Sequence, residues 1–216
     1  ALALWRGGGP EGVGREAGRG DVRGEVLKPC DAVVFPGGSG SKQAAALGKV
    51  GREAVRKYVE SGGGYLGICA GSYLCSSTYT WSLGLLPTKV VCEDCEIPGV
   101  GTRSLWYRGA STQVQMQLSE EGQNLFRDVP DLAKVRYHNG PIIRATESAP
   151  PDYTVLAYFR SEQVRYAPQE GTMIDTPAIV AAPFGKGKVV AISPHPESSP
   201  ELASVISASL RYATGQ

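Results

Sequence analysis

The feature that most constrains this chain is a strand–helix–strand unit between residues 32 and 69. Two short apolar runs, residues 32–35 and 65–68, each end at a tight-turn segment. Between them, residues 41–60 place apolar side chains at helical spacing before a Ser-Gly-Gly-Gly stop. Such a unit joins parallel strands by a right-handed crossover. We therefore predict an α/β protein with a mostly parallel sheet.

The middle of the chain favours β-structure. Apolar patterns predict strands at residues 89–92, 103–107, 112–118, 133–137 and 154–159. A hairpin is predicted from residues 178–182 and 189–192, which flank a Gly-containing turn, and a closing helix from residues 200–212.

The ends of the chain and its domain organisation follow from composition. Residues 1–5 are apolar enough for a short strand, whereas the Gly- and Arg-rich residues 6–25 predict a mobile loop or weak helix. No repeat or linker divides the chain, so we expect residues 1–216 to form one domain with a β-rich middle insertion. The first residue is Ala1 and not Met, and we expect a fragment or a processed product.

Charge and cysteine content limit the kinds of partner and the cellular compartment that we expect. The formal net charge is +1, so no strong field favours nucleic acid. No apolar run approaches the ~20 residues that span a bilayer, so no membrane partner is expected. The five cysteines are an odd number, and a chain of 216 residues needs no disulfide staples. A reducing, cytoplasmic compartment is therefore favoured, although the organelle stays open.

Cys69 is the strongest candidate for chemistry. It is the centre of a Gly-x-Cys-x-Gly segment that follows the second apolar run and precedes a predicted helix. This is the thiol form of the nucleophile elbow. The turn places the sulfur at a helix N-terminus, which favours a thiolate. The N–H of Ala70 and that of Gly37 or Gly38 would form the oxyanion hole. The alternative is a buried structural cysteine.

His195 is the candidate partner of this cysteine. It is one of two histidines and follows the apolar run at residues 189–192, within Ser-Pro-His-Pro-Glu. A cysteine nucleophile needs an imidazole to take the thiol proton and a carboxylate to fix the imidazole tautomer, and Glu197 is two residues on. A lone histidine between prolines would indicate only a turn. Together with the elbow it predicts a Cys69–His195–Glu197 triad.

Three segments carry a family resemblance: Phe35-Pro36-Gly37-Gly38, Gly67-Ile68-Cys69-Ala70-Gly71 and His195-Pro196-Glu197. They resemble the signatures of class I glutamine-amidotransferase-like proteins. Residues 62–73, 137–141 and 193–197 are most similar to the branch that includes the N-terminal domain of eukaryotic biotin–protein ligases and stand-alone bacterial members. The resemblance implies a flavodoxin-like three-layer sandwich with helices on both faces of the sheet. It also implies Cys69 as nucleophile, His195 as base and Glu197 as its orienter.

The chain departs from the amidotransferase pattern just after the nucleophile. True amidotransferases hydrolyse glutamine through a thioester, pass ammonia onward, and usually carry Gly-x-Gln, whose Gln helps to hold the substrate. Here the residues are Gly71-Ser72-Tyr73. Two functions follow. One is an amidotransferase-like hydrolase of a small-molecule amide, with a partner subunit or homodimer left open. The other is a non-catalytic binding or regulatory domain that keeps the fold.

Two further clusters are candidates for binding a substrate or a metal. With Tyr73, the residues His138 and Asn139 are candidates to contact the substrate, an expectation that rests on the resemblance. The alternative for them is an Asn-Gly turn before Pro141. Cys92 and Cys95 have Cys-x-x-Cys spacing, but zinc would need two more ligands. We therefore expect no metal site and no cofactor.

Overall fold

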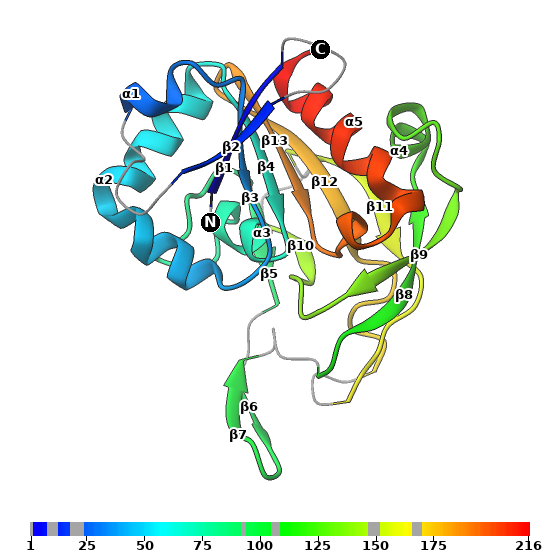
Figure 1. The fold of residues 1–216 in the computed structure, drawn as a ribbon. Coiled ribbons are helices and arrows are strands. Elements are labelled where there is room, and N and C mark those ends of the chain that lie inside the picture. The colour runs from blue at the N-terminus through cyan, green and yellow to red at the C-terminus, as the bar shows by residue number, and fades with distance from the viewer. Residues whose placement is uncertain are drawn as a thin grey trace.

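The computed structural model describes residues 2–7, 13–17, 24–91, 94–104, 109–146, 152–165 and 170–216. A nine-stranded sheet forms the body of the protein, in the order β2-β1-β3-β4-β13-β12-β11-β8-β9 (Figure 1). Its strands are β1 Leu2–Arg6, β2 Val13–Ala17, β3 Ala32–Phe35, β4 Gly64–Ile68, β8 Thr112–Leu118, β9 Leu132–Tyr137, β11 Thr154–Phe159, β12 Pro177–Phe184 and β13 Gly187–Ile192.

The centre of the sheet is parallel, as the strand–helix–strand unit predicts. Strands β3, β4 and β13 run in the same direction, and helix α2, Gly40–Glu60, makes the crossover from β3 to β4. Every residue of β4 is buried, since helices cover both faces of these strands. Helix α2 is interrupted at Gly48, where φ is 62°.

Parallel pairing is confined to this centre, and all the flanking pairs are antiparallel. The short turn between β12 and β13 is one reason, because a tight hairpin can join only antiparallel strands. The α/β class with helices on both faces is confirmed, and the sheet is mixed. The predicted parallel strands are those that carry the candidate site.

Two hydrophobic cores lie on opposite faces of the sheet. On β4, Leu66 and Ile68 pack with residues of α5, Ala203–Thr214. Their neighbour Tyr65 packs in the other core, with Val55 and Val59 of α2. This is the two-residue alternation of a strand. Figure 1 shows α2 on one side of the sheet and α5 on the other. The shorter helices are α1 Gly24–Leu27, α3 Ala70–Cys75 and α4 Glu120–Leu125, with 3-10 turns η1 Pro196–Ser198 and η2 Pro200–Leu202.

Two of the sequence predictions need correction. Residues 6–25 are not all loop or helix, because β2 lies within them and pairs with β1 along the edge of the sheet; residues 8–12 and 18–23 lie outside the described part. The β-rich middle is also not a separate insertion throughout, because β8 and β9 extend the main sheet. The remaining middle strands form two small sheets, from β5 Thr88–Val90 with β10 Ile143–Ala145 and from β6 Asp94–Ile97 with β7 Gly101–Ser104.

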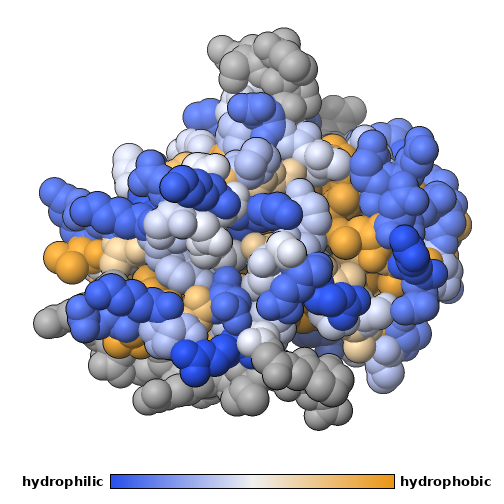
Figure 2. Space-filling model, turned by 90° about the horizontal axis from the view of Figure 1, so that it is seen from above, coloured by the Kyte–Doolittle hydropathy of each residue, from blue (hydrophilic) through white to orange (hydrophobic). Residues whose placement is uncertain are grey.

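The surface is predominantly hydrophilic on the face shown in Figure 2, and apolar residues show only in limited areas between polar ones. In the described part of the chain, the strongly exposed large apolar side chains are Val50, Leu132 and Ile174. None of the described helices combines the length and the apolar character that crossing a membrane requires.

Candidate active site

Cys69 lies at a strained turn between β4 and α3. Its φ of 50° and ψ of −97° are unusual for a residue with a side chain. Its N–H donates a hydrogen bond to the Ile192 carbonyl of β13 at 2.8 Å. A Cβ on Gly67 would lie 2.6 Å from backbone atoms of Gly71, and one on Gly71 would lie 2.1 Å from the Phe35 carbonyl oxygen. Only glycine fits at these two positions, as the elbow predicts.

His195 is fixed by its backbone and by its ring. It follows the end of β13, and its N–H donates to the Arg136 carbonyl of β9 at 2.8 Å. The ring nitrogen Nδ1 lies 2.6 Å from Oε1 of Glu197. The side chain of His195 is 7% exposed, and its Nε2 is buried without a hydrogen-bond partner among the described residues. In the neutral ring with Nδ1–H donated to Glu197, Nε2 carries a lone pair that can take a proton.

The charged groups around His195 favour its protonated form. Burial lowers its pKa, but the nearby Cys69 and Glu197 outweigh burial and raise the pKa to about 9. The ring is therefore largely protonated near neutral pH. This is the electrostatic arrangement expected of an imidazole between a sulfur and a carboxylate.

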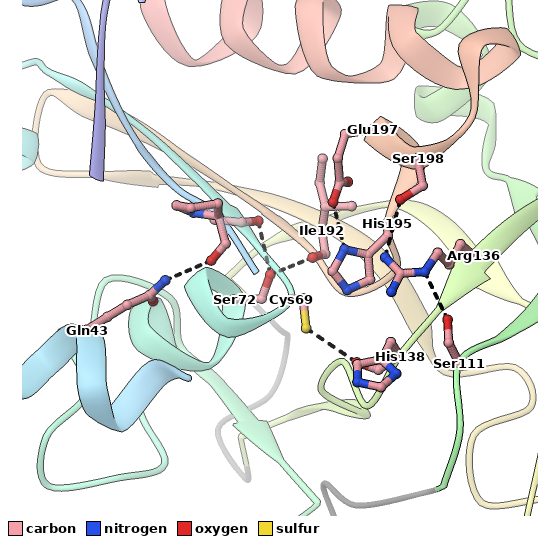
Figure 3. A network of polar contacts seen from close by, with 12 residues as sticks. Gln43, Cys69, Ser72, Ser111, Arg136, His138, Ile192, His195, Glu197 and Ser198 are labelled. Carbon is pink, nitrogen blue, oxygen red and sulfur yellow. Dashed lines mark hydrogen bonds and ion pairs between the residues drawn. The ribbon is translucent and has the colours of Figure 1, made fainter. Parts of the chain in front are cut away.

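Gly37 lies where Cys69 and His195 meet. A Cβ on Gly37 would be 2.8 Å from Cε1 of His195 and 3.8 Å from Cβ of Cys69. Figure 3 shows the Cys69 sulfur and the His195 ring near each other, each just beyond the end of one of the neighbouring parallel strands β4 and β13. The structure thus brings together residues separated by more than a hundred positions, and it does so at the carboxyl edge of the parallel strands.

The candidate oxyanion donors surround the same point. Ala70 is the first residue of α3, so its N–H has no acceptor within the helix. Gly38 lies at the end of the β3 loop with φ of 132°, a conformation that favours glycine. Gln43 of α2 donates from Nε2 to the Pro36 carbonyl at 2.7 Å, which fixes the peptide that precedes Gly37.

The turn after β9 closes the other side of the site. Asn139 has φ of 54°, in agreement with the predicted Asn-Gly turn. The Tyr73 hydroxyl donates to the Asn139 carbonyl at 3.1 Å, and the Asn139 amide donates to the Gly109 carbonyl at 3.3 Å. The Cys69 thiol donates to the His138 carbonyl at 3.6 Å. The turn is confirmed and lies beside the cysteine, and substrate contact by His138 and Asn139 stays a prediction.

The imidazole of His138 is exposed at the mouth of the site. Partial burial lowers its pKa, and the positive charges of Arg136 and His195 lower it further. His138 is therefore neutral at neutral pH and can accept or donate one hydrogen bond.

A cavity of about 500 Å³ opens in front of Cys69. Its volume is that of a small-molecule site. The lining residues are Gly38, Ser39, Gly40, Ser41, Cys69, Ala70, Tyr73, Tyr79, Trp81, Arg136, His138, Asn139 and His195. A larger cavity of about 660 Å³ lies between α2 and residues 28–31 and contains none of the predicted site residues.

Three residues of the site were missed from the sequence, and for the fourth, Trp81, the aromatic side chain indicates a place in the core or in a pocket wall. Tyr79 and Trp81 line the cavity as a stacked pair, with ring centroids 4.4 Å apart. Arg136 lines it from β9, and Gln43 supports it from α2. Nothing local distinguishes Gln43, Tyr79 or Arg136 as residues of a site. The Cys92–Cys95 pair lies partly outside the described residues, and no group of three potential metal ligands occurs within them.

Known proteins with this fold include amidotransferases. A solved glutamine amidotransferase superposes with a TM-score of 0.59 at 20% identity, over 90% of this chain and 85% of that one. PurLQS from Thermotoga maritima superposes with a TM-score of 0.52 at 18% sequence identity, over 86% of this chain and 81% of that one. A cytoplasmic protein from Salmonella typhimurium superposes with a TM-score of 0.57 at 12% sequence identity, over 98% of this chain and 94% of that one. At these identities the likeness shows the fold alone. Comparison with curated proteins finds no significant match.

The sequence itself matches a family profile. Residues 26–213 match the family described as biotin-protein ligase, N terminal. The match spans β3, the elbow, the β9 turn and the His195 segment, which are the parts that build the cavity. The chain is therefore a member of the biotin-protein ligase N-terminal family, with a glutamine-amidotransferase-like fold.

Proposed function

We propose that this protein hydrolyses a small amide with Cys69 as nucleophile, His195 as proton carrier and Glu197 as its orienter. The observation that carries the proposal is the buried Nε2 of His195. It has no partner among the described residues, it belongs to a ring held by Glu197 at 2.6 Å, and it lies at a cavity that Cys69 also lines. A buried imidazole nitrogen without a hydrogen-bond partner destabilises the folded protein, unless it bonds to a molecule bound in that cavity.

The steps use only groups around this cavity. Nε2 of His195 holds the proton taken from the thiol, and the sulfur attacks the amide carbon. The negative oxygen is stabilised by the N–H of Ala70 and that of Gly37 or Gly38. His195 then protonates the leaving nitrogen, and the carbon–nitrogen bond breaks to release ammonia or an amine. Water, deprotonated by the same imidazole, cleaves the thioester and restores the thiol.

Ammonia release from a panel of primary amides tests the proposal. We expect turnover by the wild type and a loss of at least about 10³-fold in Cys69→Ser and His195→Gln. Cys75→Ser is the matched control, because this buried thiol faces the α2 core and not the cavity. Turnover that survives in Cys69→Ser would contradict the proposal.

The binding-module alternative has one observation in its favour. Tyr73 stands two residues beyond Gly71, where amidotransferases usually carry Gln, and its hydroxyl is occupied by the Asn139 carbonyl. Under that function, small amides would bind in the cavity at the same affinity in wild type and Cys69→Ser, and none would be hydrolysed. Calorimetry on the two proteins separates the two functions.

A further inference from the structure

The charge of the cavity wall is unusually one-sided. Among the described residues that line it, Arg136 is cationic, and no Asp or Glu is present. The nearby carboxylate of Glu197 is directed to His195 and does not line the cavity. The cavity is also lined by Ser39, the N-cap of α2, and by Gly40 and Ser41, its first residues, and the N-terminus of a helix carries a partial positive charge.

Arg136 has only neutral partners in the described part of the chain. Its Nε donates to the Ser111 hydroxyl at 2.9 Å, and its Nη1 donates to the Ser198 hydroxyl at 3.3 Å. Guanidinium has five N–H donors and is always charged, so most of its donors remain for another acceptor. A carboxylate is the group that matches these donors best, through paired hydrogen bonds.

Another part of the cavity wall is formed by aromatic rings. Tyr79 and Trp81 stack with their planes 9° apart, and Tyr73 lies beside them with ring centroids of Tyr73 and Tyr79 at 6.3 Å. The Trp81 ring also covers the start of α2, because a Cβ on Gly40 would lie 3.0 Å from it. Such a wall suits a hydrocarbon chain or a planar ring.

We propose that the cavity takes an anionic carboxamide without an ammonium group: an amide whose acyl part ends in a carboxylate bound by Arg136, with its carbon skeleton against Tyr79 and Trp81. This inference rests on the proposed hydrolysis at Cys69. Glutamine has the right amide and carboxylate, but its ammonium group finds no carboxylate on the described walls. The departure from Gly-x-Gln after the nucleophile agrees with a substrate other than glutamine.

Glutaramate is the decisive probe, because it is glutamine without the ammonium group. We expect kcat/KM for glutaramate to exceed that for glutamine by at least about 10-fold. Arg136→Gln should lower kcat/KM for glutaramate by about 10- to 100-fold, mainly through KM, and lower kcat/KM for the neutral butyramide by a smaller factor. Arg136→Lys should recover part of the loss. Arg127→Gln, on the distant α4 loop, is the matched control.

A binding measurement separates this inference from the proposed chemistry. Glutarate, which cannot be hydrolysed, should bind Cys69→Ser and lose about 10-fold or more in affinity in Cys69→Ser/Arg136→Gln. If no amide is turned over, the proposed hydrolysis is contradicted. Glutarate binding would still test whether Arg136 binds a carboxylate. Equal glutarate affinity with and without the arginine, no glutarate binding at all, or a preference for glutamine over glutaramate would overturn the inference.

Discussion

At the scale of single residues, the site depends on the close approach of Gly37, Cys69 and His195. Gly37 has no room for a side chain, because a Cβ there would lie 2.8 Å from the His195 ring. The approach of His195 to Cys69 therefore requires glycine at this position for steric reasons, independently of its backbone conformation. The two glycines of the elbow are required in the same way by backbone atoms.

Gly37→Ala should displace the imidazole of His195 from Cys69. We expect the rate of Cys69 alkylation and the turnover of any substrate to fall by about 10-fold or more, since the proton acceptor moves while the fold is retained. Peptide-resolved alkylation and a thermal melt measure the two effects. Gly38→Ala is the comparison: a Cβ there meets nothing within 4 Å but would sit at φ of 132°, so its cost should appear in the melt. An unchanged alkylation rate in Gly37→Ala would contradict the steric account.

The raised pKa of His195 predicts a pH-dependent contribution to stability. The pKa is about 9 in the folded protein, against 6.5 for the ordinary side chain. Its stabilisation is therefore complete below about pH 6.5 and is lost as pH rises through about 9. In urea unfolding, the advantage of wild type over His195→Gln should shrink by about 1 to 3 kcal/mol across this window. In the Cys69→Ser background the change should be smaller, because one cause of the raised pKa is gone. A difference that grows with pH would have the wrong sign.

At the scale of elements, α2 both covers the sheet and supports the loop that follows β3. Gln43, one turn into α2, holds the Pro36 carbonyl at 2.7 Å. In a trans peptide the carbonyl and the following N–H point in opposite directions. The hydrogen bond therefore also fixes the direction of the Gly37 N–H, a candidate oxyanion donor.

Gln43→Leu should separate oxyanion stabilisation from thiol activation. Turnover is expected to fall by about 10-fold, and the free energy of unfolding by about 1 kcal/mol, because one hydrogen bond is lost. Cys69 alkylation, which forms no oxyanion, should stay near the wild-type rate. Lys42→Ala, at the exposed neighbouring position, is the control for helix stability. An equal fall in alkylation and turnover would show that Gln43 supports the whole site and not the loop alone.

At the scale of the whole molecule, stability resides in the two cores and not in the peripheral hairpin. Strands β6 and β7 pair only with each other in the described part of the chain, and Figure 1 shows them extending away from the main sheet. Leu66, in contrast, is fully buried beneath α5.

Replacing residues 95–103 by a short Gly-Ser turn should leave the melting temperature within about 2 °C of wild type. Leu66→Ala should cost about 2 to 5 kcal/mol, because it opens a cavity at the centre of the sheet. Calorimetry of both variants provides the comparison. A large loss of stability from the hairpin replacement would show contacts to the body beyond those described.

The sequence predicts best where the signal is local. The bounds of β3, β8 and β11 follow from apolar runs and alternation, and the elbow follows from glycine spacing. Edge strand β2 was missed because its Gly- and Arg-rich composition does not favour a strand. Its backbone hydrogen bonds to β1, a distant pairing, stabilise it as one. Arg136 and Trp81 reach the cavity only after the sheet is assembled from distant segments. A residue whose role depends on such long-range placement carries no local mark.

Peptide-resolved alkylation of Cys69 by iodoacetamide across pH, in wild type and His195→Gln, tests the central pairing most directly. Cys30 is an internal reference in the same protein, because it lines the other cavity, whose lining includes neither Cys69 nor His195. Cys75 is a second reference, because burial raises the pKa of its thiol. If the imidazole activates the sulfur, Cys69 in the wild type reacts fastest near neutral pH and slows by about 10-fold in His195→Gln, while Cys30 is unchanged. Identical Cys69 profiles in the two proteins would contradict the pairing and leave only the fold and the family standing.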